Sequence, residues 1–149
     1  MAKKPPPPPT EAGPALDKWL AEWLMGWVRG SKIPWWYTLG ADSLPATCEH
    51  KIADWNPSTS TALALDKVAE AMRAKGWRWK CGTSALSPDL FYCHFWGHKC
   101  LDGARHESKS AAVCLAASKA RYAELSRKAY LHPRTLSAQE AAEAAKEKK

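Results

Sequence analysis

The chain has 149 residues, a formal net charge of +7 and a sequence pI near 9.2. This length favours one domain with tails, and the hydrophobic content of 46% is enough for a core. No run of about 18 apolar residues is present, which excludes a membrane-spanning helix. The positive charge favours anionic partners, although several lysines lie in the predicted tails and leave the remainder only mildly basic.

We predict three parts along the chain. Residues 1–14 form a proline-rich disordered tail, in which Pro5 to Pro9 adopts a polyproline II rod that acts as a spacer. Residues 15–131 form a single α+β domain. Residues 132–149 form a second flexible tail, rich in alanine, lysine and glutamate, which is locally helical but has no apolar face.

The first predicted element is an amphipathic helix from Leu16 to Val28, because its apolar residues recur at helical spacing. Gly30 is expected to end it. Residues 31–54 predict a long irregular segment, since two prolines and a glycine interrupt it. The aromatic run Trp35-Trp36-Tyr37 in this segment is a candidate partner-binding hot spot. The alternative is that these rings hold the loop against the core.

A loop that leads into a second helix lies at Trp55-Asn56-Pro57-Ser58-Thr59. Pro57 keeps the preceding residue out of the helical region, and Ser58 or Thr59 can cap the first amides of the helix. This helix is predicted from Thr59 to Lys75, and Gly76 suits the left-handed cap position that follows. Its buried stripe comprises Leu65, Val68, Ala69 and Met72.

The hydrophobic period then changes from that of a helix to that of a strand. Trp77 to Cys81 and Phe91 to Trp96 each alternate between two faces, which predicts two antiparallel strands. A third short strand near Lys99 to Leu101 would complete a small meander. A third helix opens at Ser108 and ends at Pro133. These elements predict an α+β fold, in which a small antiparallel β-meander is packed with three α-helices.

Three segments, taken in chain order, carry a resemblance to a known family. A first helix ends in Met25-Gly26-Trp27, an aromatic-x-Pro-Ser-Thr segment begins at Trp55, and Ser108 to Ala120 is an alanine-rich helix. In this order and spacing they resemble the phage ABA sandwich domain, which has similar motifs in its opening helix, its central segment and its closing helix. Two departures concern acidic residues, because the family's Asp after Pro-Ser-Thr is Ser60 here and its Pro-Glu is Ser110-Ala111.

The resemblance implies an α-β-α sandwich, a bacteriophage origin and action in the host bacterial cytoplasm. It implies little about activity, because the family is largely uncharacterised and a fold does not fix a function. The five cysteines agree with this setting, since an odd count with no apolar secretory segment before it predicts reduced thiols in a cytoplasm.

Cysteines and histidines of the kind that bind zinc gather in the strand region, but their spacing is poor. No Cys-x-x-Cys pair is present, and Cys93 shares a strand face with Phe91 and Phe95, which indicates core packing. We therefore expect no metal and no cofactor. The residues concerned are Cys81, Cys93, Cys100, His94, His98 and His106.

Nucleophilic catalysis is not predicted either. Cys93 and His94 are neighbours in sequence, so on a strand they point to opposite faces and cannot form a nucleophile–base pair. The sequence lacks a Gly-rich phosphate loop, a paired-carboxylate motif and a Gly-x-Ser-x-Gly motif. We expect no enzyme activity.

Two groups of residues are candidates for binding an anionic ligand. Basic and aromatic side chains share one face of the two strands, where they can stack on bases and contact phosphates. The start of the second helix supplies amides and hydroxyls suited to an anion. If the sheet is covered on both faces, the first group is core and the second only caps a helix. The candidates are Arg78, Lys80, Tyr92, His94 and Trp96 on the strands and Trp55, Asn56, Ser58 and Thr59 at the helix start.

These patterns predict a non-enzymatic bacteriophage accessory protein that binds an anionic nucleotide-type ligand. It would counter host defence by sequestering a nucleotide signal. One alternative is an inhibitor that binds a host defence enzyme through Trp35-Trp36-Tyr37, and another is a DNA-binding accessory factor. A homo-oligomer is a further expectation, because a small tryptophan-rich domain can cover its rings with a second copy.

Overall fold

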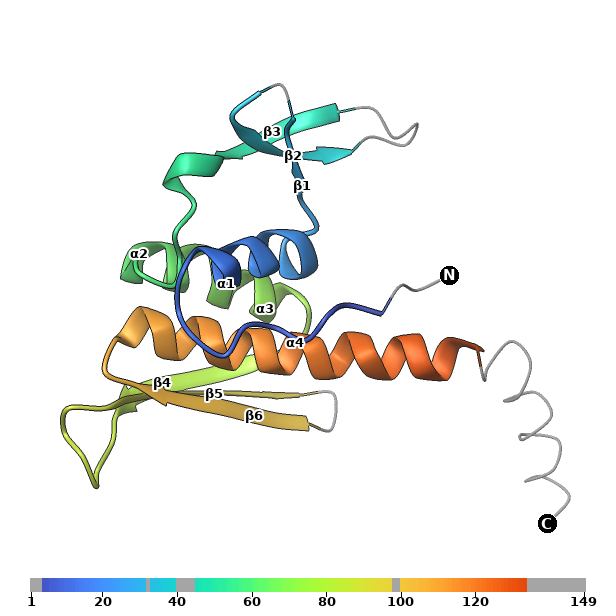
Figure 1. Cartoon of the computed structure of the whole chain (residues 1–149). Helices are drawn as coiled ribbons and strands as arrows, with labels where there is room; N and C mark the ends of the chain where they lie inside the picture. Colours follow the sequence, from blue (N-terminus) through green and yellow to red (C-terminus); the bar gives the residue numbers. More distant parts are fainter. Residues whose placement is uncertain (1–3, 32, 40–44, 98–99, 134–149) are drawn as a thin grey trace, which may run out of the picture. The chain divides into compact units, whose positions relative to one another are not determined.

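A computed structural model describes residues 4–31, 33–39, 45–97 and 100–133 of the protein (Figure 1). The chain divides into two compact units, one from Pro8 to Arg121 and the other joining Met1–Pro7 to Tyr122–Lys149. The first unit contains two three-stranded antiparallel sheets and several helical segments, so the fold is α+β. No helix in the described ranges has both the length and the apolar character needed to cross a membrane.

The first helix begins earlier and ends earlier than predicted. It comprises α1 (Pro14–Trp19) and a π-helical continuation, η1 (Leu20–Leu24). Proline suits its first position, because the first helical amide needs no partner within the helix. The helix ends before Gly26, whose φ of 73° turns the chain away, and the predicted stop at Gly30 is therefore wrong. Its buried apolar face comprises Leu16, Trp19, Leu20, Ala21 and Leu24.

The prediction of an irregular segment over residues 31–54 is wrong, because residues 35–39 and 45–51 are strands of a sheet. The sheet has the order β1 (Val28–Arg29), β2 (Trp35–Leu39) and β3 (Pro45–Lys51), and a 3-10 turn, η2 (Ile52–Asp54), follows it. Pro45 does not break β3, because it is the first residue of the strand, where a missing N–H is tolerated. The aromatic and β-branched residues of β2 favour a strand.

The second helix is continuous from Thr61 to Ala74, as α2 (Thr61–Leu63), η3 (Ala64–Ala69) and α3 (Glu70–Ala74). The cap is Ser60, whose hydroxyl accepts a hydrogen bond of 3.3 Å from the Leu63 amide, so the prediction of Ser58 or Thr59 is wrong. At the other end Gly76 has a φ of 93°, which confirms its predicted role as a left-handed cap.

The predicted antiparallel meander is confirmed as the sheet β4 (Arg78–Thr83), β5 (Phe91–Gly97) and β6 (Cys100–His106). The third strand is longer than expected and pairs with β5 along its whole length. Cys93 and Phe95 of β5 are fully buried, whereas their strand neighbours Tyr92, His94 and Trp96 are not. One face of this sheet therefore belongs to the core and the other does not.

The helix α4 (Lys109–Pro133) begins after Ser108 and ends at Pro133, as predicted. Within the first unit, every residue from Ser110 to Ser118 is buried. A helix that is buried all round lies between two layers. On one side Arg121 donates a hydrogen bond of 2.9 Å to the Trp23 carbonyl, and Figure 1 shows the β4–β6 sheet on the other side.

Candidate ligand-binding face

The strand pairing of the second sheet brings the predicted basic and aromatic residues together on one surface. Arg78 lies opposite Trp96, Lys80 lies opposite His94, and Tyr92 lies opposite Arg105. We call this surface the outer face, because it is the face directed away from the core. It comprises Arg78, Lys80, Gly82, Tyr92, His94, Trp96, Leu101, Gly103 and Arg105.

The outer face is exposed and is not a second core layer. Arg78, Lys80 and Arg105 are exposed, and Trp96 retains 38% of its accessible surface. Tyr92 and His94 are half-buried. The alternative interpretation, that the sheet is covered on both faces, is therefore wrong for this part of the chain.

Two aromatic rings of the outer face lie close over glycine residues of the neighbouring strands. A Cβ atom at Gly82 would be 3.1 Å from the Tyr92 hydroxyl oxygen, and a Cβ atom at Gly103 would overlap the His94 imidazole. The Tyr92 and His94 rings have centroids 5.2 Å apart and an interplanar angle of 43°. Both residues also line an open cavity, so part of each ring is accessible for stacking. We call these two rings the ring pair.

The charge of the outer face is positive and has no acidic neighbour on the same face. Asp102 is the acidic residue of the three strands, and it lies opposite Phe95 on the core side. Burial raises the pKa of the Asp102 carboxyl, and Lys119 partly offsets this shift. Arg78, Lys80 and Arg105 therefore have no carboxylate among the residues of the outer face, which leaves their charges available to an anion.

Two open cavities border the ring pair and share His94 and Arg105. One has a volume of about 310 Å³ and extends over the loop after β4, where Leu86 is 89% exposed. The other has a volume of about 460 Å³ and extends over β6 to Lys119 of α4. Together they make the outer face a hollowed surface rather than a flat one.

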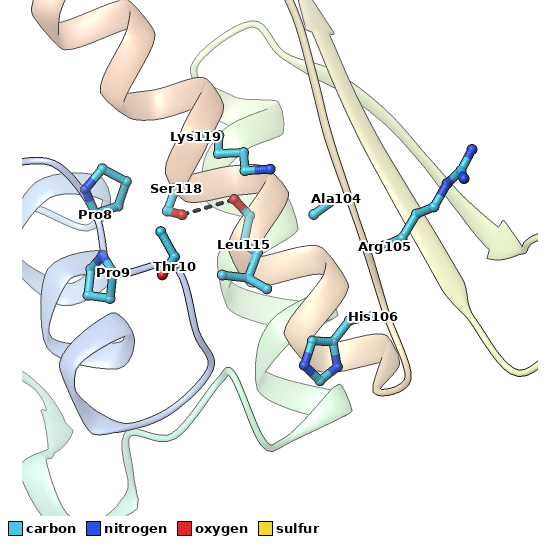
Figure 2. Close-up of a pocket in the computed structure, with 9 residues that line it drawn as sticks. All are labelled: Pro8, Pro9, Thr10, Ala104, Arg105, His106, Leu115, Ser118 and Lys119. Atoms are coloured by element: carbon cyan, nitrogen blue, oxygen red, sulfur yellow. Dashed lines mark hydrogen bonds between the residues drawn. The ribbon is translucent and has the colours of Figure 1, made fainter.

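A third cavity, of about 290 Å³, lies between α4, β6 and the segment Pro8 to Thr10 (Figure 2). Figure 2 shows that the Arg105 side chain extends away from the other lining residues. The Ser118 hydroxyl donates a hydrogen bond of 2.9 Å to the Leu115 carbonyl and is thus already paired. Pro8 and Pro9 line this cavity, so the end of the predicted spacer contacts the domain.

The predicted anion site at the second helix is occupied by the protein itself. The Ser58 amide donates a hydrogen bond of 2.8 Å to a carboxylate oxygen of Asp17, and Ser58 is 1% exposed. The Trp55 indole donates a hydrogen bond of 2.7 Å to the Asp17 carbonyl, and Trp55 is buried. Asn56 and Thr59 are exposed, and neither lines the two cavities of the outer face. These four residues form a structural junction.

The aromatic run on β2 does not form a single exposed surface. Trp36 is 1% exposed, and the Arg29 guanidinium lies 5.9 Å from the centroid of its ring. The Trp36 indole nitrogen is buried without a hydrogen-bond partner among the described residues. Trp35 and Tyr37 are half-buried on the opposite side of the strand. Three adjacent rings therefore divide between core and surface.

Two cysteines, Cys93 of β5 and Cys114 of α4, lie in the core. Cys81 lies opposite Cys93, and burial raises the pKa of the Cys93 thiol to about 12. Burial also raises the pKa of Cys114 well above its usual value. The Cys93 and Cys114 thiols therefore stay protonated at neutral pH, which suits packing rather than metal binding or nucleophilic attack. Within the described residues no group of three His, Cys, Asp or Glu side chains could hold a metal ion, and His98 lies outside them.

Sequence reasoning missed part of the outer face. Gly82 was outside the first strand, which was predicted to stop at Cys81, and Gly103 and Arg105 were outside the third, which was predicted to stop at Leu101. Extending that strand to His106 would have placed Leu101, Gly103 and Arg105 on the same face by simple alternation. The signal was therefore present in the sequence.

Comparison with known proteins finds no matching family model, no matching curated protein and no matching solved structure. The resemblance to the phage ABA sandwich domain thus depends on the three sequence segments. The functional interpretation depends on the geometry of the outer face.

Proposed function

We propose that this protein binds an anionic nucleotide-type ligand on the outer face and carries out no covalent chemistry. One exposed sheet surface brings together three aromatic rings and three cations and has no carboxylate. This observation carries the proposal. The rings are Tyr92, His94 and Trp96, and the cations are Arg78, Lys80 and Arg105.

The chemistry of a nucleotide matches this surface in both of its parts. A base can stack on a ring whose outward face is open, and stacking tolerates any base because each has a π-face. The phosphates can contact guanidinium and ammonium groups, with arginine able to bind two phosphate oxygens at once. Sheets that combine aromatic and basic side chains bind unpaired bases in this way.

The biological setting that we propose is a bacteriophage accessory protein of the ABA sandwich type in the host cytoplasm. Its support is the resemblance of the three sequence segments. Binding alone would suffice for such a role, because sequestering a nucleotide signal lowers its free concentration without any reaction. The ligand would then be a signal of the host's defence.

Calorimetric titration against a panel of linear and cyclic nucleotides tests the proposal. Lys80→Ala combined with Arg105→Ala should weaken binding of any nucleotide that gives heat, because both cations border the ring pair. Lys67→Ala removes one exposed lysine from the second helix and is the matched control. The absence of heat from every nucleotide in the panel would overturn the proposal.

The exposed leucines favour a second candidate function, the binding of a host protein. Leu86 and Leu101 are 89% and 69% exposed and border the two cavities of the outer face. Exposed apolar side chains that are bordered by polar and charged ones are typical of a protein interface. Leu101→Asp should then release a host protein that survives nuclease and phosphatase treatment. If Lys67→Ala released the host protein as well, the result would argue against binding through Leu101.

A further inference from the structure

We infer that the ligand of the outer face contains at least two bases joined by a phosphodiester, and is not a mononucleotide. This inference rests on the proposed function and deepens it. It follows from the spacing of the rings and of the cations along β5.

The outer face has two places where a base can stack. Tyr92, His94 and Trp96 are alternate residues of β5. The Cα atoms of neighbouring members therefore lie about 7 Å apart, and those of Tyr92 and Trp96 about 14 Å apart. The ring pair, with centroids 5.2 Å apart, forms one stacking place. Trp96 lies one alternate position beyond it and forms the second. One base covers either the ring pair or Trp96, but not both.

Each stacking place has its own cation from a neighbouring strand. Lys80 and Arg105 lie opposite His94 and Tyr92, and so serve the ring pair. Arg78 lies opposite Trp96. A mononucleotide at one place would leave the ring and the cation of the other without a partner. A phosphodiester between two bases would lie beside Lys80 and Arg78, which are alternate residues of β4.

The spacing also determines the conformation of the ligand. Bases stacked on each other are about 3.4 Å apart, about half the distance between alternate residues of a strand. Two bases on this face are therefore separated from each other and each stacks on protein. Such separated bases are characteristic of single strands and of cyclic dinucleotides, and a base-paired duplex does not provide them.

The two glycines make room for the rings of the ring pair, which together offer an area large enough for one base. Gly82 and Gly103 allow the Tyr92 and His94 rings to lie down in opposite directions, one over β4 and the other over β6. The ring pair therefore extends from β5 toward both neighbouring strands. Trp96, whose partner Leu101 is a large residue, has no such glycine beside it and stays 38% exposed.

Titration calorimetry with three probes tests this inference: adenosine monophosphate, the linear dinucleotide of adenosine with a terminal phosphate, and cyclic diadenosine monophosphate. We expect at least one dinucleotide to bind roughly 10- to 100-fold more tightly than the mononucleotide, since a second stacked base contributes that much. Tighter binding of the cyclic probe points to a cyclic signal, and tighter binding of the linear probe points to a strand.

The variant Trp96→Ala gives the decisive comparison. It should remove the advantage of the dinucleotide and restrict the monophosphate to the ring pair, whereas Trp96→Phe should restore most of the advantage. Trp35→Ala removes a half-buried tryptophan from the other sheet and is the control. Equal affinities for all three probes would overturn this inference and leave the proposed function standing. No binding by any nucleotide would overturn both.

Discussion

The Ser58 amide donates a hydrogen bond of 2.8 Å to the Asp17 carboxylate, and this contact joins residues 41 positions apart. Asp17 is 5% exposed, and burial raises the pKa of its carboxyl above the usual value of 3.8, partly offset by the two hydrogen bonds from Ser58. Ser58 in turn accepts a hydrogen bond of 3.0 Å from the Ser110 hydroxyl through its carbonyl. The first helix, the loop before the second helix and the start of α4 therefore meet at one polar junction.

Removal of the Asp17 carboxylate is expected to destabilise the protein. Asp17→Ala leaves the buried Ser58 amide without an acceptor, which should cost about 1–3 kcal/mol of unfolding free energy. Asp17→Asn keeps an acceptor oxygen of similar size and should cost less. Urea unfolding at pH 7 measures both values. Equal losses of unfolding free energy in the two variants would show that the hydrogen bond to Ser58 does not cause the destabilisation.

The raised pKa of Asp17 also predicts a pH dependence. Because the folded state binds this proton more tightly than the unfolded state, ionisation of Asp17 opposes folding at neutral pH. That cost is relieved as the pH falls through the raised pKa toward 3.8. The unfolding free energy of the wild type relative to that of Asp17→Asn should therefore increase as the pH is lowered from 7 to 4. A difference that does not change with pH would contradict this assignment.

Gly103→Ala is expected to weaken ligand binding and to preserve the fold. The added methyl group would overlap the His94 imidazole, which is the end of a side chain on an open face and can move away. We expect a loss of affinity of about 10-fold, in the range of one lost stacking contact. The double variant with His94→Ala should bind no more weakly than His94→Ala alone, because both act through the same ring. If the losses of affinity from the two substitutions were additive, Gly103→Ala would not act through the His94 ring.

The cations of the outer face should be visible in the salt dependence of binding. Each phosphate contact removed from a single strand reduces the slope of log affinity against log salt by about 0.7. Lys80→Ala and Arg105→Ala should each show this reduction with a thymidine oligonucleotide as the probe. Lys67→Ala should leave the slope unchanged. A slope that is equal in all four proteins would exclude a phosphate at these side chains.

The position of the helix cap can be tested by two neighbouring substitutions. Ser60→Ala should lower the unfolding free energy by about 1 kcal/mol, because it removes the acceptor of the Leu63 amide. Thr59→Ala should have little effect, since the exposed Thr59 hydroxyl donates only to the Asn56 carbonyl, at 3.2 Å. Thermal unfolding of both variants compares them directly. The opposite order would restore the cap that the sequence predicted.

Thiol labelling should separate the cysteines by burial. Cys48 is exposed and should react with an alkylating reagent in the folded protein. Cys93 and Cys114 should remain unmodified, because both are buried and burial raises the pKa of Cys93 to about 12. Peptide mass spectrometry identifies the labelled positions. Labelling of Cys93 without loss of the fold would disprove its place in the core.

Local periodicity predicted the second sheet, and through it most of the outer face. The alternation at Tyr92, His94 and Trp96 needed no knowledge of distant residues, because it is a property of any strand. The first sheet was missed because Pro45 was interpreted as a break, although a proline at the first position of a strand is tolerated. Its chain neighbours Gly40 to Leu44 lie outside the described residues.

The Ser58 prediction failed for a different reason. A serine after proline and before a helical pattern resembles a cap, and local sequence favours that interpretation. Its actual partners are Asp17 and Gly13, more than 40 positions away, and no local rule predicts such contacts. Contacts of this kind are properties of the packed domain. Because they occupy the polar groups of Ser58, the start of the second helix is not part of the candidate site.

The glycines beneath the ring pair have a consequence for how this sequence can vary. At Gly103 any side chain would collide with the imidazole of His94, and at Gly82 it would crowd the Tyr92 ring. A substitution at either position therefore displaces the ring above it unless the cross-strand partner changes as well. In diverged copies of this gene, a larger residue at 103 should be accompanied by a smaller one at 94, and joint retention of both pairs would mark the lineages that still use the face.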